Sequence, residues 1–300
     1  MFGITITIDA VKLLWEATEW IWGEMIPQYS KSLKIRLPRS KFKEQKQKQM
    51  KYQKLRKVSI KKTKKRKHAL LYLLKKGIDE LQQLLNKSKK KPDERTRKRL
   101  KIIKLLYQQQ LYMQQNNKTS VKDRIVSLSQ DHIRPIVRGK ENKPVEFGIK
   151  AHVMQVDGVN FIEHHTFNAF NESTRLQNAV RKHQKLIGTC THLGADGIYP
   201  TNKNRKYCTK NNILTNFVKK GPVKDDKPTK QMKAILNKER STRLEGSFGT
   251  EKEHYGLRKI KARTSQTQIA WMFFGVFTAN AVLLAKRKAE KERILLKKAA

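Results

Sequence analysis

The sequence has few cysteines and few acidic residues, and each shortage excludes a class of protein. Its 300 residues include two cysteines, Cys190 and Cys208, which fit neither a disulfide framework nor a C-x-x-C zinc site. We therefore expect a protein of a reducing compartment. Only 25 residues are aspartate or glutamate against 68 lysines and arginines, so the formal net charge is +43. Because such a chain repels itself, the expected partner is a polyanion, either nucleic acid or an anionic membrane surface.

Long apolar segments are also scarce. The N-terminus has no basic lead before its apolar stretch and no small-residue cleavage site, so we expect no cleavable signal peptide. One nearly continuous apolar run covers residues 269–285, with Arg263 before it and Lys286–Lys288 after it. The run is slightly shorter than the roughly 20 residues that a spanning helix needs, and Thr278 and Asn280 interrupt it. We expect a buried core helix here, with a C-terminal membrane anchor as the alternative.

Residues 1–26 read as a strand followed by a helix. Three isoleucines alternate with threonines between Gly3 and Asp9, a pattern typical of a strand. Apolar residues then recur at helical spacing over Val11–Trp22. Asp9 lies between the two elements, where an aspartate commonly serves as the N-cap of the helix.

Residues 27–120 form a strongly basic region. Nearly half of residues 31–70 are lysine or arginine, and Glu44 is the only acid among them. This composition favours partial disorder, with either a diffuse counter-ion cloud or a DNA-contacting surface as its role. Apolar residues at helical spacing over Leu70–Leu85 and Asp93–Gln115 predict two helices. We interpret the region as a basic helical insertion between strands.

The segment from residue 121 to 290 returns to strand patterns before it becomes helical again. Period-two alternation predicts strands at 123–130, 133–140 and 145–164, the last folded as a hairpin around Asp157-Gly158. An amphipathic helix is expected over 171–187, a short strand before Asp196, a short helix from Thr201 and a loop over 219–230.

The stretch Glu239–Ile260 has the most informative spacing. As a helix it places Glu245 and Lys252 two turns apart on one face, with Arg243 just before the glutamate. A carboxylate beside a cation suits a metal ligand that must also meet a polyanion. A solvated helix of mixed charge has the same spacing, so the pattern alone leaves both interpretations open.

Several motifs give this stretch a more specific meaning. It contains R-x-E-x-x-F-G-x-x-K followed by Y-G-L, which resembles the C-terminal signature of DDE transposases of bacterial insertion sequences. Other stretches similar to the same group occur in order: K-L-L-W-E (12–16), D-R-I-V-S-L-S-Q (123–130), R-P-I-V-R-G-K (134–140), E-F-G-I-K (146–150), F-N-E-S-T-R-L (170–176) and A-D-G-I-Y-x-T-x-x-N-R-x-Y-C (195–208). The resemblance implies an α/β fold, namely an RNase H-like mixed sheet flanked by helices, with the basic helical insertion after the first strand. Residues 1–26 would then be the first strand and helix of the catalytic core, and residues 121–290 its remainder.

The resemblance also implies a catalytic site of three acids. In the family one aspartate lies on the first strand, a second at the end of a later strand, and a glutamate on a following helix. By motif, Asp196 matches the second acid and Glu245 the third. Asp9 is the preferred first acid because it follows a strand, and Asp123 is the alternative.

Three converging carboxylates suit the chemistry of phosphodiester cleavage. Attack on a phosphodiester concentrates negative charge, and two Mg²⁺ or Mn²⁺ ions held by carboxylate oxygens can stabilise that charge. The resemblance therefore assigns the metal ligands to Asp9, Asp196 and Glu245. Lys252 is the expected DNA phosphate contact, with Arg243 next.

The implied function is that of a DNA transposase, which cleaves and transfers strands at insertion-sequence ends. Its implied partners are double-stranded DNA and a second copy of the chain in a synaptic complex, in the bacterial cytoplasm with the nucleoid. Only eight residues precede Asp9, and Ala10 runs directly into Val11 where the family has a longer connection. These departures predict an N-terminally truncated or decayed copy. The alternative is a non-catalytic basic nucleic-acid-binding protein whose acids serve as caps and ion pairs.

Overall fold

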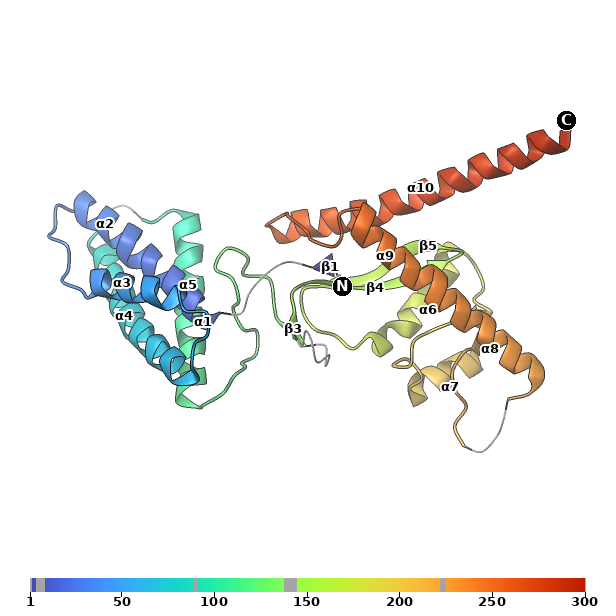
Figure 1. The fold of residues 1–300 in the computed structure, drawn as a ribbon, viewed down its shortest axis with the longest axis horizontal. Coiled ribbons are helices and arrows are strands. Elements are labelled where there is room, and N and C mark those ends of the chain that lie inside the picture. The colour runs from blue at the N-terminus through green and yellow to red at the C-terminus, as the bar shows by residue number, and fades with distance from the viewer. Residues whose placement is uncertain (1, 4–8, 89–90, 138–144, 222–224, 300) are drawn as a thin grey trace. The chain divides into compact units, whose positions relative to one another are not determined.

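The chain divides into two units, one helical and one of mixed α/β structure (Figure 1). The computed structural model describes residues 2–3, 9–88, 91–137, 145–221 and 225–299. The helical unit comprises residues 6–135, and the mixed unit joins residues 136–300 to residues 1–5. The predicted α/β class is confirmed in this general sense, with much more helix than strand.

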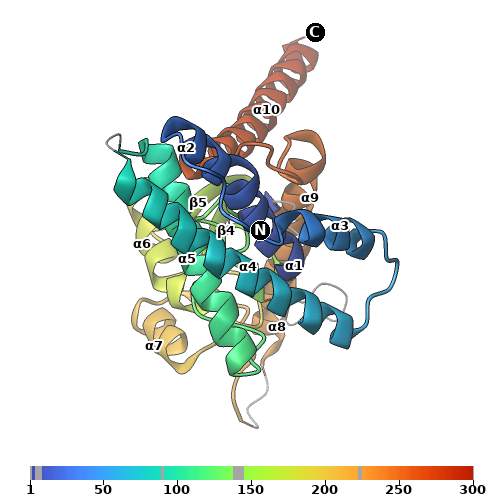
Figure 2. The same cartoon turned by 90° about the vertical axis from the view of Figure 1, so that its left-hand side faces the viewer.

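The helical unit is built around two long helices, α4 and α5. Its elements are α1 (Ala10–Glu19), a π-helical turn (Trp20–Met25), α2 (Ile26–Ser32), α3 (Phe42–Gln53), α4 (Ile60–Lys87) and α5 (Glu94–Gln115), which Figure 2 turns toward the viewer. The helices predicted over Leu70–Leu85 and Asp93–Gln115 are confirmed as parts of α4 and α5. Asp9 caps α1, since its Oδ1 accepts hydrogen bonds from the backbone N–H groups of Val11 and Lys12 at 2.9 and 3.1 Å.

A single apolar core joins α1, the π-helical turn, α4 and α5. The indole Nε1 of Trp22 donates a hydrogen bond to the backbone oxygen of Leu73 at 3.0 Å, and Gly77 one turn later leaves room for the ring. Residues 10–26 therefore belong to the helical unit. The resemblance had implied that residues 1–26 belong to the catalytic core. The structure differs because the apolar face of α1 packs against α4.

The basic stretch before Leu70 forms α3 and the first half of α4, where composition favoured partial disorder. Arg66 joins the two helices. Its buried guanidinium donates hydrogen bonds to Oε1 of Gln49 at 2.8 Å, and to Oε1 and the backbone oxygen of Gln45 at 2.5 and 2.8 Å. Burial lowers the pKa of Arg66, and the three acceptors offset part of the cost of desolvating its charge.

The strand predicted at 123–130 is wrong, because these residues form no ladder. The side chain of Gln109 on α5 takes the place of a neighbouring strand. Its Nε2 donates to the backbone oxygen of Asp123 at 3.2 Å, and its Oε1 accepts from the N–H of Ile125 at 2.8 Å. Ile125 and Leu128 are buried in the core of the helical unit. Val126 is buried as well, so burial along this segment does not alternate as it would in a strand with one face exposed.

The mixed unit combines short strands with helices. Its strands are β1 (Phe2–Gly3), β2 (Ile136–Val137), β3 (Val145–Glu146), β4 (Gly148–Val156), β5 (Val159–Thr166), β6 (His192–Leu193) and β7 (Leu214–Thr215). Its helices are α6 (Leu176–Leu186), α7 (Asn202–Lys210), α8 (Lys227–Glu239), α9 (Glu245–His254) and α10 (Ser265–Ala299), with a 3₁₀ turn at Glu172–Arg175 and a π-helical turn at Arg240–Leu244. In the described residues the strands form three small sheets: β1-β4-β5 and β2-β3, both antiparallel, and the parallel pair β6-β7.

The β4–β5 hairpin is the largest strand pairing of the mixed unit, and it confirms the predicted turn at Asp157-Gly158. Both turn residues have positive φ, 46° and 76°, as a tight two-residue hairpin turn requires. Of the strand predicted for Gly3–Ala10, Gly3 pairs with Gly148, residues 4–8 lie outside the described residues, and Asp9 and Ala10 are instead the N-cap and the first residue of α1. Likewise, of the strand predicted at 133–140 only Ile136–Val137 forms, and 138–140 are not described.

The C-terminal half of the mixed unit contains more helix than predicted. α8 begins at Lys227, inside the segment predicted as a loop, because Oδ1 of Asp226 caps it by accepting from the N–H of Thr229 at 2.9 Å. The helices α8 and α9 continue through the π-helical turn to His254. The helical prediction for Glu239–Ile260 is thus confirmed as far as residue 254.

Helix α10 lies on one face of the β4–β5 hairpin and α6 on the other (Figure 1). Met272 and Val276 of α10 are fully buried, whereas Phe274 and Phe277 are 72 % and 53 % exposed. The Asn280 carboxamide accepts from the N–H of Asn160 at 2.9 Å and donates to its backbone oxygen at 2.8 Å. By length and composition α10 could cross a membrane, and only 22 % of its apolar window is buried. The prediction of a buried core helix therefore holds for one face only.

Candidate functional site

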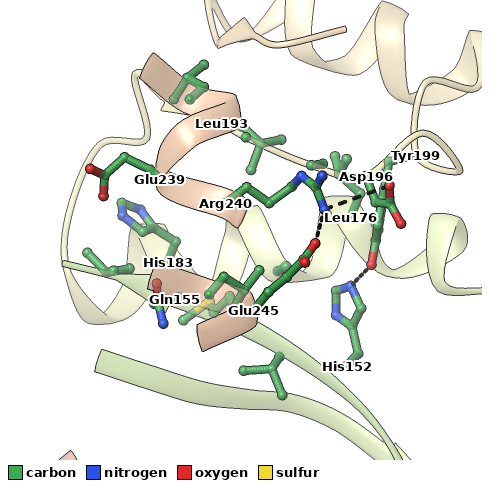
Figure 3. Close-up of a pocket in the computed structure, with 18 of the residues that line it drawn as sticks. His152, Gln155, Leu176, His183, Leu193, Asp196, Tyr199, Glu239, Arg240 and Glu245 are labelled. Atoms are coloured by element: carbon green, nitrogen blue, oxygen red, sulfur yellow. Dashed lines mark hydrogen bonds and ion pairs between the residues drawn. The ribbon is translucent and has the colours of Figure 1, made fainter. Parts of the chain in front are cut away.

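A cavity of about 760 Å³ in the mixed unit brings together residues that are far apart in the sequence (Figure 3). Strand β4 and the turn after it form one wall, and α6 forms another. The remaining walls are the segment 192–199 and the face of α8, the π-helical turn and α9 that carries Leu236, Arg240, Glu245, Phe248 and Lys252.

The two acids predicted from the motifs, Asp196 and Glu245, both line this cavity. Asp196 follows β6, as expected of an aspartate at the end of a strand, and Glu245 is the first residue of α9. The guanidinium Nη1 of Arg240 is 2.7 Å from Oε1 of Glu245 and 3.9 Å from Oδ1 of Asp196 (Figure 3). The carboxylates therefore converge on one cation.

The π-helical turn explains how Arg240 reaches both acids. The backbone N–H of Glu245 donates to the oxygen of Arg240, a bond over five residues that stacks the two side chains on one side of the helix. The hydroxyl of Thr242 also bonds to the backbone oxygen of Lys238 at 2.7 Å within this turn. Single π-type turns inside α-helices occur frequently at functional sites. The motif alone gives the spacing of Arg240 and Glu245 but not this widened turn.

A buried chain of polar side chains supports the Asp196 loop. Arg175 binds the carboxylate of Glu163 with two hydrogen bonds, and Oε2 of Glu163 is 3.0 Å from Nδ1 of His152. The Nε2 of His152 is 2.9 Å from the hydroxyl of Tyr199, which points toward it in Figure 3. The N–H of Tyr199 in turn donates to the backbone oxygen of Asp196 at 3.0 Å. The chain thus fixes the loop that presents Asp196.

The protonation states of this chain follow from burial and charge. Burial lowers the pKa of His152, although Glu163 opposes the shift, so the imidazole is neutral at pH 7. Burial raises the pKa of Glu163, but the hydrogen bonds and charge of Arg175 outweigh it and the net shift is downward. Burial and nearby carboxylates raise the pKa of Tyr199. With Nδ1–H donating to Glu163, Nε2 accepts the Tyr199 hydroxyl hydrogen.

No family model, curated protein or solved structure matches this chain.

The two cations predicted to contact DNA have different surroundings. Arg243 lies outside the cavity lining and forms ion pairs with Asp157 at 3.2 Å and Glu239 at 3.0 Å. Lys252 lines the cavity with Glu245, so the predicted common face of these two residues is confirmed. Lys252 is therefore better placed than Arg243 to meet an anion in the cavity.

Neither candidate for the first acid belongs to the unit that holds the cavity. Asp9 is part of the helical unit, where its Oδ1 caps α1. Asp123 is also in the helical unit, has a left-handed backbone with φ of 52°, and lies 4.0 Å from the Arg134 guanidinium. Since the predicted strand at 123–130 does not form, the structural context expected of a first acid is missing at Asp123. The choice of first acid remains a prediction.

Within the described residues no group of three histidine, cysteine or acidic side chains has the arrangement of a metal site. Two of the three predicted ligands, Asp196 and Glu245, do face the same cavity. They already form ion pairs with the guanidinium of Arg240. Their carboxylate oxygens are the kind of donor that a hard divalent ion prefers, and in this structure the Arg240 guanidinium lies between them.

The residues that support the Asp196 loop, namely Tyr199, His152 and Glu163, were not predicted from the sequence. Tyr199 lies within the quoted motif A-D-G-I-Y, so the motif itself was a signal for it. His152 and Glu163 lie on paired strands 11 residues apart, and only the register of the β4–β5 hairpin brings them together. No pattern in the linear sequence marks such a pair.

Proposed function

We propose that this chain is a DNA strand-cleaving and strand-transfer enzyme of the DDE transposase type. The main support is the convergence of Asp196 and Glu245 on one cation in one cavity. These are the two acids whose motifs match the family, one after a strand and one on a later helix. The chain has 68 lysines and arginines against 25 acidic residues, and this excess of positive charge supports DNA as the substrate.

The proposal requires a divalent ion, Mg²⁺ or Mn²⁺, with Asp196 and Glu245 as its ligands. Such ions, when bound, activate a nucleophile and stabilise the departing oxygen of a phosphodiester. In the chain itself, Lys252 offers a cation to the DNA backbone within the cavity. The Tyr199–His152–Glu163 chain keeps the Asp196 loop in place.

The resemblance implies a third carboxylate as well and assigns it to Asp9. The strand predicted before Asp9 lies in residues 4–8, outside the described residues. Asp123 is kept as the alternative. Substituting each by asparagine separates them, because only loss of the true ligand should abolish cleavage.

The test is metal-dependent nicking of supercoiled plasmid DNA by the full chain with Mg²⁺ or Mn²⁺. We expect Asp196→Asn and Glu245→Gln to lower nicking by on the order of 100-fold or more, because each removes a charged ligand. Glu253→Gln is the matched control, since Glu253 is on the same helix but pairs with Arg258 and does not line the cavity. It should nick like the wild type.

DNA binding separates loss of chemistry from loss of fold. Both variants should bind duplex DNA with the salt dependence of the wild type, because binding relies on the basic surface. Nicking that persists in both variants would contradict the proposal.

A second candidate function is a non-catalytic nucleic-acid-binding protein. It is favoured by the pairing of both acids with Arg240 and by the lack of a three-residue metal group among the described residues. Salt-sensitive DNA binding without nicking, together with lower stability in Asp196→Asn and Glu245→Gln, would support this candidate instead.

A further inference from the structure

The helical unit has a groove of its own, lined by residues that the proposed chemistry does not use. Its volume is about 570 Å³, within the roughly 300–1,000 Å³ of ligand-binding clefts. It lies between the segment before α3 and one face of α4, and its lining is Arg39, Ser40, Lys41, Gln45, His68, Ala69, Tyr72, Leu73 and Lys76.

One wall of the groove is a ladder along α4. His68, Tyr72 and Lys76 follow each other at intervals of one turn, so their side chains lie in a row. Tyr72 is 71 % exposed, which presents most of its ring to solvent. A single exposed tyrosine is common on protein surfaces. Here the ring lies on α4 between His68 and Lys76, and the opposite wall of the groove is cationic.

The opposite wall is basic and is held in place. Arg39 and Lys41 lie on this wall, and the Nζ of Lys76 donates to the backbone oxygen of Arg39 at 2.8 Å across the groove. The floor is fixed from both sides. Gln45 is bound by the buried Arg66, and the backbone oxygen of Leu73 accepts the indole N–H of Trp22. The groove is therefore a built feature of the unit.

We propose that this groove binds an unpaired stretch of nucleic acid, with a base stacked on Tyr72 and phosphates held by Arg39, Lys41 and Lys76. A cationic groove with an exposed aromatic ring is the arrangement that holds single strands, because every base has a face that can stack. A base inside a duplex has both faces covered by its neighbours, so a duplex cannot use the ring. The groove thus selects for strands that have been separated.

The test uses the full chain and a labelled oligothymidylate of about 15 nucleotides, with a duplex of equal length as the comparison. Binding is followed by fluorescence anisotropy in EDTA at about 0.2 M salt, where weak surface contacts are screened. We expect Tyr72→Ala to weaken binding of the single strand by on the order of 5- to 100-fold and to leave duplex binding unchanged. Tyr72→Phe should bind like the wild type, because the ring is kept.

The charge contacts have their own readout. Lys76→Gln should reduce the slope of log Kd against log salt by about 0.7, the value for one phosphate contact on a single strand. Tyr72→Ala should leave this slope unchanged. An oligouridylate arm distinguishes DNA from RNA. The proposal is supported if Tyr72→Ala weakens binding of either the oligothymidylate or the oligouridylate.

The matched control is Tyr112→Ala, which removes another exposed tyrosine of the same unit, on α5 and outside the groove. Equal weakening by Tyr72→Ala and Tyr112→Ala would overturn the proposal, and so would equal loss of single-strand and duplex binding. The assay contains no divalent ion, so it does not rest on the proposed cleavage activity. Nicking is measured separately with Mg²⁺ or Mn²⁺, which keeps failure here distinct from failure of the nicking assay.

Discussion

At the scale of single residues, Arg240 sets the charge of the cavity in the mixed unit. Its guanidinium lies between the carboxylates of Asp196 and Glu245. A cation at this distance stabilises both carboxylates and competes with any ion that binds there.

This competition gives a first prediction. Arg240→Gln should bind Mn²⁺ about 5- to 10-fold more tightly than the wild type, because the carboxylates lose their internal cation. Isothermal titration calorimetry with Mn²⁺ measures the change. Arg243→Gln is the control, since Arg243 pairs with Asp157 and Glu239 instead. Unchanged affinity in Arg240→Gln would show that the ion binds elsewhere.

His152 gives a second prediction, about pH. Burial lowers its pKa in the folded chain, while the unfolded chain has the ordinary value of about 6.5. Protons therefore bind the unfolded state more tightly. The contribution of His152 is complete above about pH 6.5 and is lost as the pH falls toward the folded pKa.

The measurement is urea unfolding between pH 5 and 8. The wild type should lose stability below about pH 6.5, at up to about 1.4 kcal/mol per pH unit. His152→Gln keeps a polar partner for Glu163 but cannot titrate, so its profile should be flatter over this range. The groups that face His152 are Glu163, Glu172, Arg175 and Tyr199. Because the pKa of Glu163 is lowered, the stability that its carboxylate contributes is lost only at more acidic pH than that of His152. Parallel profiles would count against a neutral buried His152.

At the scale of elements, α4 packs tightly against the π-helical turn at Gly77. A Cβ atom added at Gly77 would lie 2.5 Å from Nε1 of Trp22 and 2.9 Å from Cγ2 of Ile21. The indole cannot easily retreat, since its N–H is bonded to Leu73.

Gly77→Ala should therefore destabilise the helical unit by about 1–3 kcal/mol, as overpacking of a core does. Urea unfolding followed by tryptophan fluorescence measures it, because three of the four tryptophans are in this unit. Gly23→Ala is the control within the same unit. Its new Cβ would meet its nearest neighbour at an ordinary 3.5 Å, so the unfolding free energy should stay the same or rise. A Gly77→Ala variant as stable as the wild type would mean that the two helices are less tightly packed.

The sequence predicted those elements whose signals are local. Examples are the cap at Asp9, the hairpin at Asp157-Gly158 and the helical periods of α4 and α5. It failed where a side chain replaces backbone pairing, as Gln109 does beside Ile125. It also failed where a charge is buried, as at Arg66, because composition treats arginine as a surface residue.

Only part of the candidate site could be predicted from the sequence. Motifs pointed to Asp196 and Glu245, which the cavity brings together. The register of β4 on β5 decides that His152 meets Glu163, and a widened helical turn decides that Arg240 meets Glu245. Both depend on geometry that no spacing rule encodes.

At the scale of the whole molecule, α10 raises the question of a membrane. Its apolar length permits a crossing, yet Met272 and Val276 pack inside the mixed unit and Asn280 bonds to β5. Insertion would break these contacts. We therefore expect carbonate extraction of cell membranes to release the protein. Asn280→Leu should shift part of the chain toward the membrane fraction, since it removes both hydrogen bonds and adds apolar surface. Wild-type protein retained in the pellet would mean that α10 leaves the unit.

The carboxamide of Asn280 has one more consequence. In the described residues β5 is the last strand of its sheet, so its outer edge pairs with no further strand there. By engaging both the N–H and the oxygen of Asn160, one side chain imitates the partner that a growing sheet would add. A chain that ends before α10 would lose these two hydrogen bonds, and we expect its copies to pair through the edge of β5 and aggregate.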